Sequence, residues 1–261
     1  MAAALSLALP VAAPGHPPSL PDAVWRADQM GSYRSTPVPS GYQALDRELP
    51  NGGWPPSVLI ELLMAQAGIG ELRLLAPTLA RLTQADKTVI LLGPPHIPYP
   101  AALEDLGIRL KKLILIETDK AADRIWAIEQ TLKSASFGAL LCWLPQARSD
   151  HLRRLQLAAA GGEGLSFVFR PLNTQDTSSP APLRIVCQPA AAGRMSVELI
   201  KRRGPIHAAP LILPLAIPEI LRQPLTNRMS GTTISDTPSY AVDRPTPVSY
   251  THLTLPTIYS V

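Results

Sequence analysis

Cysteine is scarce in this chain, and the side chains that usually hold metals or perform nucleophilic catalysis form no recognised pattern. The two cysteines, Cys142 and Cys187, lie in apolar surroundings, which is typical of small core residues in a reducing compartment. His96, His151 and His207 share no metal-binding spacing with one another or with either cysteine. A Gly-x-Ser-x-Gly nucleophile motif is also missing. We therefore expect no disulfide framework, no metal centre and no catalytic triad.

Long hydrophobic runs are missing as well. No run reaches the ~18 apolar residues that would predict a membrane span. The segment from Leu5 to Ala13 is apolar, but no Lys or Arg precedes it and Pro10 interrupts it, which is unlike a signal peptide. We expect a cytoplasmic protein that makes no contact with a membrane.

Charged and aromatic residues are sparse, at 17% and 5% of the chain, and the net charge is +4. This balance allows weak or indirect DNA contact but does not by itself predict it. The basic run Lys201, Arg202 and Arg203 follows the last expected strand and is the candidate contact with DNA or a partner. No aromatic residues alternate with these cations to stack on bases. A solvated strand end that discourages edge pairing is the alternative interpretation.

Proline, in contrast, is abundant: the chain has 29 prolines, which cluster towards its ends. This composition predicts a disordered leader over 1–22, a folded domain over 23–215 and a disordered tail over 216–246. Residues 248–257 resemble one reading frame of a transposase adapter used in DNA sequencing. Residues 247–261 are therefore interpreted as a probable sequencing-adapter artefact and excluded from fold reasoning. The apolar stretch 211–221 leaves two alternatives open, a docking peptide for a partner or a segment that packs back on the domain.

Short apolar runs alternate with amphipathic segments through the middle of the chain. The pattern predicts strands at 57–63, 88–92, 113–116, 139–144 and 165–170, and helices at 40–49, 70–82, 101–106, 120–135 and 151–160. Continuous apolar strands that alternate with helices indicate an α/β fold with a mostly parallel sheet covered on both faces. Two further strands, 183–188 and 195–201, are expected to form an antiparallel extension.

The segment from Ser57 to Leu72 has the order of a phosphate-binding P-loop, strand then glycine-containing loop then helix, but not its chemistry. Against the pattern G-x-x-x-x-G-K-[ST], Ala65 stands at the first glycine, Gly70 at the second, Glu71 at the lysine and Leu72 at the hydroxyl residue. A carboxylate repels phosphate, and leucine cannot ligate magnesium. The N–H groups of Gly68 and Gly70 still offer an anion site. The favoured interpretation is that Glu71 complements the helix dipole.

These residues resemble the RecA-type ATPase core, and most closely its degenerate relatives, the translesion-synthesis accessory family ImuA and the division-inhibitor family SulA. The likeness covers roughly residues 24–215. Four blocks carry it, which are the turn 49–55, the stretch 61–63 leading to 68–75, the pair 98–99 with 106–108, and the stretch 197–204.

The resemblance implies a RecA-like, P-loop-type fold from which the catalytic positions have been lost. An acidic water-activating residue is expected after the second strand, where Gly93 and the following Pro94, Pro95 and His96 stand instead. A magnesium-binding aspartate is expected at the end of the fourth strand, near the position that Trp143 occupies. Phosphoryl transfer depends on positioned cations. We therefore expect a non-enzymatic protein with no catalytic residue, cofactor or metal.

For function, the resemblance to ImuA implies an SOS-induced adaptor in error-prone translesion synthesis. Its partner would be an ImuB-type Y-family polymerase homologue, with RecA and an error-prone replicative-type polymerase as further partners. The alternative is a SulA-like inhibitor that binds the tubulin-like division protein. The Gly52-Gly53-Trp54-Pro55 turn and the basic run 201–203 favour ImuA over the shorter SulA. A weak RecA-type ATPase is the third possibility.

Overall fold

The computed structural model describes residues 36–118, 120–204 and 209–222. The predicted leader 1–22, most of the predicted tail and the adapter-like residues 247–261 lie outside these ranges. Within them the helices are α1 (Gln43–Glu48), α2 (Glu71–Gln84), α3 (Pro100–Asp105), α4 (Ala121–Ser134), α5 (Ser149–Ala159) and α6 (Glu219–Arg222). The strands are β1 (Leu59–Met64), β2 (Val89–Leu92), β3 (Leu113–Ile116), β4 (Ala139–Trp143), β5 (Leu165–Pro171), β6 (Leu183–Ala190), β7 (Arg194–Lys201) and β8 (Leu211–Pro214).

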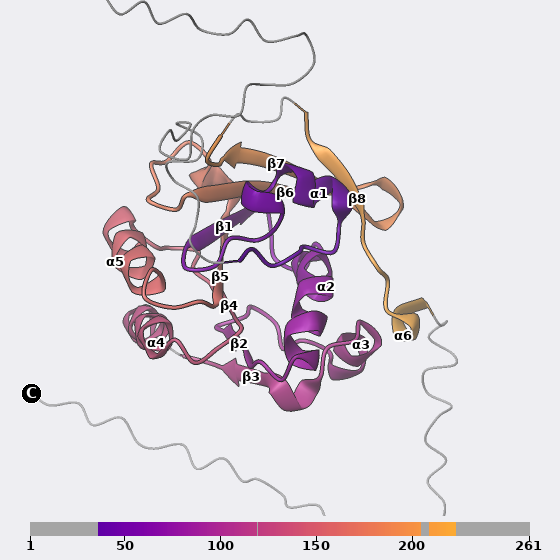
Figure 1. Ribbon diagram of the computed structural model, residues 1–261, viewed down its shortest axis with the longest axis horizontal. Helices are drawn as coiled ribbons and strands as arrows, with labels where there is room; N and C mark the ends of the chain where they lie inside the picture. Colours follow the sequence, from indigo (N-terminus) through magenta and orange to yellow (C-terminus); the bar gives the residue numbers. More distant parts are fainter. Residues whose placement is uncertain (1–35, 119, 205–208, 223–261) are drawn as a thin grey trace, which may run out of the picture. The chain divides into compact units, whose positions relative to one another are not determined.

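All eight strands form one sheet in the order β3-β2-β4-β5-β1-β6-β7-β8. The strands from β3 to β6 in this order pair in parallel, and β7 and β8 add two antiparallel strands at the β6 side. The predicted α/β fold with an antiparallel extension is confirmed. Because β1 lies between β5 and β6, its carboxyl end and the loop that follows it lie near the middle of the sheet (Figure 1).

Helices cover the two faces of the sheet separately (Figure 1). On one face α2 buries Leu74, Leu75 and Leu79 against the sheet, and α3 adds Leu103 to the same core. On the other face α4 and α5 pack side by side over a second core. The central strands β1, β4 and β5 are buried on both sides, as their unbroken apolar sequences predict, whereas β3 at the edge is partly exposed. None of the helices in the described ranges combines the length and the apolar content that a bilayer crossing requires.

The turn before β1 is fixed by a buried tryptophan. Trp54 is fully buried, packs edge-on against Phe167 with ring centroids 5.2 Å apart, and donates its indole N–H to Thr78 Oγ1 at 3.1 Å. Its backbone pairs with Val38. At Gly53 an added Cβ would lie 2.6 Å from the Val38 carbonyl oxygen, so this close approach requires glycine. The turn singled out by the resemblance therefore anchors the amino-terminal segment to the core.

The chain after β7 returns to the domain. β8 pairs with β7, and Leu213 and Leu215 are buried. Of the two alternatives for the apolar stretch, packing back on the domain is therefore confirmed for residues 211–215. Helix α6 lies within the stretch expected to be a disordered tail, and the Ile220 N–H donates to Asp105 Oδ2 of α3 at 2.8 Å. The isolated sequence could not predict this docking because α6 has only four residues.

Candidate functional site at the carboxyl ends of the parallel strands

The loop between β1 and α2 connects a strand to a helix, and the protein's own carboxylate accepts hydrogen bonds from its N–H groups. Gly68 and Gly70 have φ values of +81° and +115°, which favour glycine. The Gly68 N–H lies 2.8 and 3.0 Å from the two carboxylate oxygens of Glu71, and the Gly70 N–H donates to Oε2 at 3.2 Å. The Glu71 side chain is buried. A phosphate would therefore have to displace a buried carboxylate from the N–H groups that it needs.

A segment from the far end of the domain also lies against this loop. Arg73, in the first turn of α2, donates to the carbonyl oxygens of Ala216 at 2.7 Å, Leu215 at 3.0 Å and Gly193 at 3.3 Å. Leu215 packs so close that a Cβ added at Gly70 would lie 3.1 Å from its methyl group. Desolvation lowers the pKa of Arg73. The chain after β8 thus packs against the loop and the first turn of α2.

The other P-loop positions lack phosphate chemistry. Leu72 is half-buried and packs against the core on the α2 side. Ala65 is exposed and lines a cavity together with Trp143, the residue near the expected metal position. The structure therefore brings Ala65 and Trp143 together. It places Gly68, Gly70 and Glu71 in a separate hydrogen-bonded turn.

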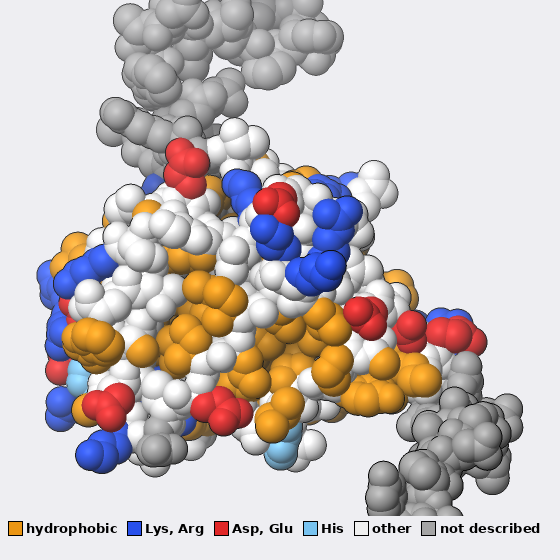
Figure 2. Space-filling model, turned by 90° about the horizontal axis from the view of Figure 1, so that it is seen from below, with side chains coloured by type: hydrophobic (Ala, Val, Ile, Leu, Met, Phe, Trp, Pro, Cys, Tyr) orange, Lys and Arg blue, Asp and Glu red, His pale blue; other side chains and the backbone are white. Residues whose placement is uncertain are grey.

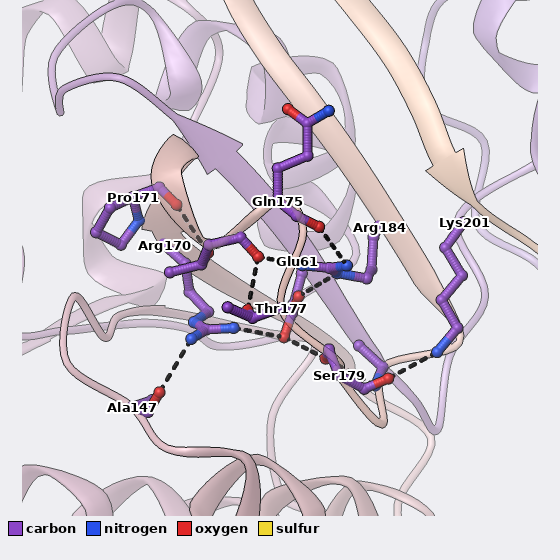
Figure 3. Close-up of polar contacts among 11 residues, drawn as sticks. Glu61, Ala147, Arg170, Pro171, Gln175, Thr177, Ser179, Arg184 and Lys201 are labelled. Carbon is purple, nitrogen blue, oxygen red and sulfur yellow. Dashed lines mark hydrogen bonds and ion pairs between the residues drawn. The ribbon is translucent and has the colours of Figure 1, made fainter.

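A buried ion cluster lies on β1 beside this loop (Figure 3). Glu61 is fully buried, and its carboxylate accepts from Ser179 Oγ at 2.6 Å and Arg184 Nε at 2.7 Å. Arg170 Nη1 lies 3.4 Å from the same carboxylate. Two guanidinium groups and one carboxylate leave this cluster with one excess positive charge. Both arginine side chains are almost completely buried, so water screens the charges little.

The cluster joins two connections to the sheet, the one between β4 and α5 and the one between β5 and β6. Arg184 also donates to the carbonyl oxygens of Thr174 at 2.8 Å and Gln175 at 3.0 Å. Arg170 donates to the Ala147 carbonyl oxygen at 3.0 Å. In the sequence, Glu61 stands out only as part of a family block, and the cluster is not predicted. The available signal was a glutamate in the middle of an apolar strand, because a buried carboxylate requires charged or hydrogen-bonding partners.

A cavity of about 250 Å³ opens where the parallel strands β1, β2, β4 and β5 end. Ligand sites in open α/β sheets usually lie at this edge. Among the cavity's walls, Trp143 stacks on Phe169 with ring centroids 4.5 Å apart and planes inclined by 28°. The rest of the lining is Met64, Ala65, Gln66, Ala67, Gly93, Pro94, Pro95, Arg124, Pro145, Arg170 and Pro171. The described lining of the cavity is therefore mainly apolar and includes two arginines.

Both cysteines are buried core residues, as predicted. Desolvation raises the pKa of each thiol to about 12. Neither thiol therefore ionises near neutral pH, and the ionised form is the nucleophile. Within residues 36–118, 120–204 and 209–222, no group of three His, Cys, Asp or Glu side chains is arranged to hold a metal ion.

The basic run at the end of β7 makes contacts within the domain. Lys201 Nζ donates to the Ser179 carbonyl oxygen at 2.7 Å. Arg202 forms an ion pair of 3.0 Å with Glu48 of α1 and also donates to the Glu48 carbonyl oxygen. Arg203 is exposed. Contact of these three residues with DNA or a partner remains a prediction, and two of the cations already hold neighbouring segments in place.

The sheet ends on the other side in an apolar surface. Among the described strands, β3 pairs only with β2, so its second edge is open. Exposed hydrophobic side chains come from β3 and from the segments on either side of it: Ile97, Tyr99, Ile114, Leu115 and Trp126, here called the β3 edge surface. Figure 2 views the molecule from the β3 side and shows hydrophobic side chains gathered across that face. Open apolar edges are typical sites of protein association.

Comparison with known proteins relates the central part of this domain to one family. The family model described as "Cell division inhibitor SulA" matches residues 59–166. The proteins named cell division inhibitor SulA from Yersinia pestis (strain Pestoides F) and Yersinia pseudotuberculosis (serotype O:1b, strain IP 31758) are 29% identical to this chain over 107 residues. The match covers 41% of this chain and 64% of each relative, so the chain spans less than two thirds of their length. The similarity to SulA is confirmed over this segment, whereas a specific relationship to ImuA stays a prediction.

Proposed function

We propose that this chain acts by binding another protein, as a SulA-like inhibitor of the tubulin-like division protein. The observation that carries the proposal is the location of the β3 edge surface, because all five of its residues lie inside the segment that matches the SulA model. A cytoplasmic location and induction by DNA damage belong to the same proposal.

A non-enzymatic role fits the chemistry at the strand ends. Glu71 occupies the N–H groups that a P-loop offers to phosphate. The β4 position where a magnesium-binding carboxylate is expected holds Trp143 in an aromatic stack. Phosphoryl transfer would need cations that these residues do not supply. This arrangement favours a RecA-like domain that binds a partner through its surface. It is less suited to a domain that hydrolyses a nucleotide.

The β3 edge surface has two means of holding a protein partner. The open backbone edge of β3 can accept an added strand, and alternate side chains then enter pockets on the partner. Trp126 and Tyr99 are 63% and 56% exposed, and such aromatic residues are common binding hot spots. Ile114 and Leu115 project to opposite faces of the strand. A partner that covers the edge would therefore bury apolar area on both sides.

The test is polymerisation of the tubulin-like division protein from the same organism, followed by sedimentation with increasing amounts of the purified full chain. The wild type should inhibit polymerisation. Ile114→Lys should weaken inhibition at least ~10-fold, because a charge would be buried at the interface. The matched control is Leu157→Lys on α5, a site that is 71% exposed and outside the β3 edge surface. Unimpaired polymerisation with the wild type, or equal inhibition by both variants, would overturn the proposal.

The adaptor hypothesis starts from the part of the domain outside the matched segment. The Trp54 turn and strands β6, β7 and β8 are folded parts of the domain that the SulA match does not cover. A longer domain of this kind motivates the ImuA-like alternative. In this alternative the chain is an adaptor that binds an ImuB-type polymerase homologue, and RecA and an error-prone polymerase are further partners.

Co-purification of the full chain with the ImuB-type protein distinguishes the two functions. Retention of that protein by the wild type but not by Arg202→Ala, with division-protein polymerisation unaffected, would favour the adaptor. The variant removes the ion pair between Arg202, which follows β7, and Glu48 of α1, so its folding must first be checked by circular dichroism. Failure of the wild type to retain the ImuB-type protein would remove the adaptor hypothesis.

A further inference from the structure

Strand β3 is a sheet edge without the usual protection against pairing. Its residues from Leu113 to Ile116 are all apolar, and Ile114 and Leu115 are 47% and 39% exposed. Edge strands that stay unpaired usually carry a lysine, a proline or a bulge. β3 has none of these and pairs with β2 in an unbroken parallel register. Its open edge is therefore suited to pairing with a further strand.

Basic side chains gather where β3 begins. They are Lys87, Arg109, Lys111 and Lys112, here called the amino-end cluster. Arg109 precedes the 3₁₀ turn η2 (Leu110–Lys112), and η2 leads directly into β3. Because Val89 pairs with Leu113, Lys87 stands at the level of Lys111 in the neighbouring chain segment. The cluster therefore lies at the amino end of the open edge, opposite to the strand-end cavity.

Most of this positive charge faces solvent. Lys112 pairs with Asp86 at 2.7 Å, and within residues 36–118, 120–204 and 209–222 no other carboxylate forms an ion pair with the cluster. Lys87, Arg109 and Lys111 are exposed. Figure 2 shows Lys and Arg side chains gathered beside the hydrophobic side chains of the same face. Acidic side chains of a partner would meet these three cations without first breaking an ion pair, which favours a partner of complementary charge.

Exposed aromatic rings come from helices on both faces of this edge. Tyr99 is the N-cap of α3, which packs on the α2 face of the sheet, and Trp126 lies on α4, which packs on the other face. Successive side chains of an added strand project to opposite faces, and that strand would lie ~4.8 Å from β3. Apolar residues at successive positions would therefore face both helices, and the strand would continue beside η2.

We propose that the β3 edge takes up an extended segment of a protein partner by strand addition. The segment is apolar where it lies along Leu113–Ile116 and acidic where it passes the amino-end cluster. This inference rests on the part of the proposed function that places a protein partner on the β3 edge surface, and it adds the chemistry of the segment that binds there.

The test measures fluorescence polarisation of a fluorescein-labelled peptide with the purified full chain at low ionic strength. The peptide joins Asp-Glu-Asp-Glu to Val-Thr-Val-Tyr-Val, and a second peptide has the two halves in reverse order, because an added strand can run in either direction. One of the two should bind with a Kd of about 100 µM or tighter. Lysines in place of the acidic residues should weaken binding at least ~10-fold. Two adjacent prolines in the apolar half should do the same, because they remove backbone donors.

Variants of the chain locate the bound peptide, after circular dichroism has shown that each is folded. Ile114→Lys should weaken binding at least ~10-fold, because it places a charge on the edge. Arg109→Glu combined with Lys111→Glu should also weaken it at least ~10-fold, and this difference should shrink as salt is added. The matched control is Arg47→Glu combined with Arg153→Glu, which changes the net charge equally at exposed sites outside the cluster. This control should bind within about 2-fold of the wild type.

Several results would overturn the inference. They are no binding of either peptide at about 1 mM, equal binding of the lysine peptide, an equal effect of the two charge-reversal pairs, and tighter binding of DNA than of the acidic peptide. A dimer of the chain that Ile114→Lys dissociates would also overturn it, because a second copy would then occupy the edge.

The outcome can be separated from that of the proposed function. Peptide binding without inhibition of division-protein polymerisation would support this inference and contradict the proposed function. Inhibition that Ile114→Lys weakens but Arg109→Glu combined with Lys111→Glu leaves unchanged would support the proposed function and contradict the acidic segment.

Discussion

Neutralising Glu61 should be one of the most damaging single substitutions in this domain. Glu61→Gln keeps the shape of the side chain but removes the negative charge that faces Arg170 and Arg184. Both guanidinium groups would remain buried, at 6% and 7% side-chain exposure, and could not regain water without opening the sheet. Their other acceptors are uncharged carbonyl oxygens.

The size of the effect follows from this geometry. Removing one partner of a buried ion pair typically costs about 3–5 kcal/mol, because the remaining charge is left buried without compensation. The retained amide oxygen can still accept one hydrogen bond, so we expect the lower half of that range, ~3–4 kcal/mol. Whole domains are stable by only about 5–15 kcal/mol. The variant should therefore fold but lose a large fraction of its stability.

Urea unfolding followed by circular dichroism measures this loss. With a slope near ~2 kcal/mol per M, the midpoint should fall by about 1.5–2 M. The matched control is Asp86→Asn, which breaks the 2.7 Å pair with Lys112 at a site where the Asp86 side chain is 76% exposed. Asparagine tolerates the positive φ of this position, and the expected loss is within about 1 kcal/mol.

The reasoning fails if Glu61→Gln is as stable as the control. Such a result would mean that water reaches the guanidinium groups or that the carbonyl acceptors alone compensate them. Glu61→Gln combined with Arg184→Gln should cost less than the sum of the two single losses, because both single variants lose the same Glu61–Arg184 ion pair. If the stability loss of the double variant equalled the sum of the two single losses, this result would also contradict a direct interaction between Glu61 and Arg184.

Three further predictions concern the strand-end loops and the core. Glu71→Ala leaves the Gly68 and Gly70 N–H groups without their carboxylate and should cost about 1–3 kcal/mol in urea unfolding; a cost below that of the surface variant Glu104→Ala would argue against the anion role of Glu71. Gly93→Ala should cost about 1–3 kcal/mol, because of its φ of +61° and the approach of Arg124, and more than Gly52→Ala, where an added Cβ meets open space. Both cysteines should resist a thiol reagent at pH 8 until urea unfolds the chain, and rapid labelling of the native protein would refute this. Burial raises the pKa of both thiols to about 12, above the ordinary thiol value of 9.0, so the unfolded chain loses these protons first. The stability that comes from the two buried thiols is therefore complete below pH 9 and is lost as pH rises towards 12.

Much of the fold could be predicted from local sequence patterns. The core strands and the helices lie close to their expected positions because a strand buried on both faces needs an unbroken apolar run, and α2 and α5 need apolar residues at helical spacing. β8 and α6 were the exceptions. Leu211–Pro214 becomes a strand only because it pairs with the edge of β7. A pattern within residues 211–214 cannot predict this pairing.

The candidate site was predicted only in part. The sequence indicated that Glu71 replaces the phosphate-binding lysine, and the structure adds that its carboxylate binds the loop N–H groups. The Glu61 cluster joins residues more than 100 positions apart. The sequence around Arg170 and Arg184 therefore does not predict that they pair with Glu61. The cavity likewise depends on four strands that end at the same edge.

By itself, the sequence determined the alternation of strands and helices and the loss of P-loop chemistry, because both depend on residues close together in the chain. Only the tertiary structure decided which charges share a buried carboxylate, and that one edge of β3 stays unpaired among the described strands. These features arise when strands distant in sequence become neighbours. Their energies depend on burial, which exists only once the sheet has formed.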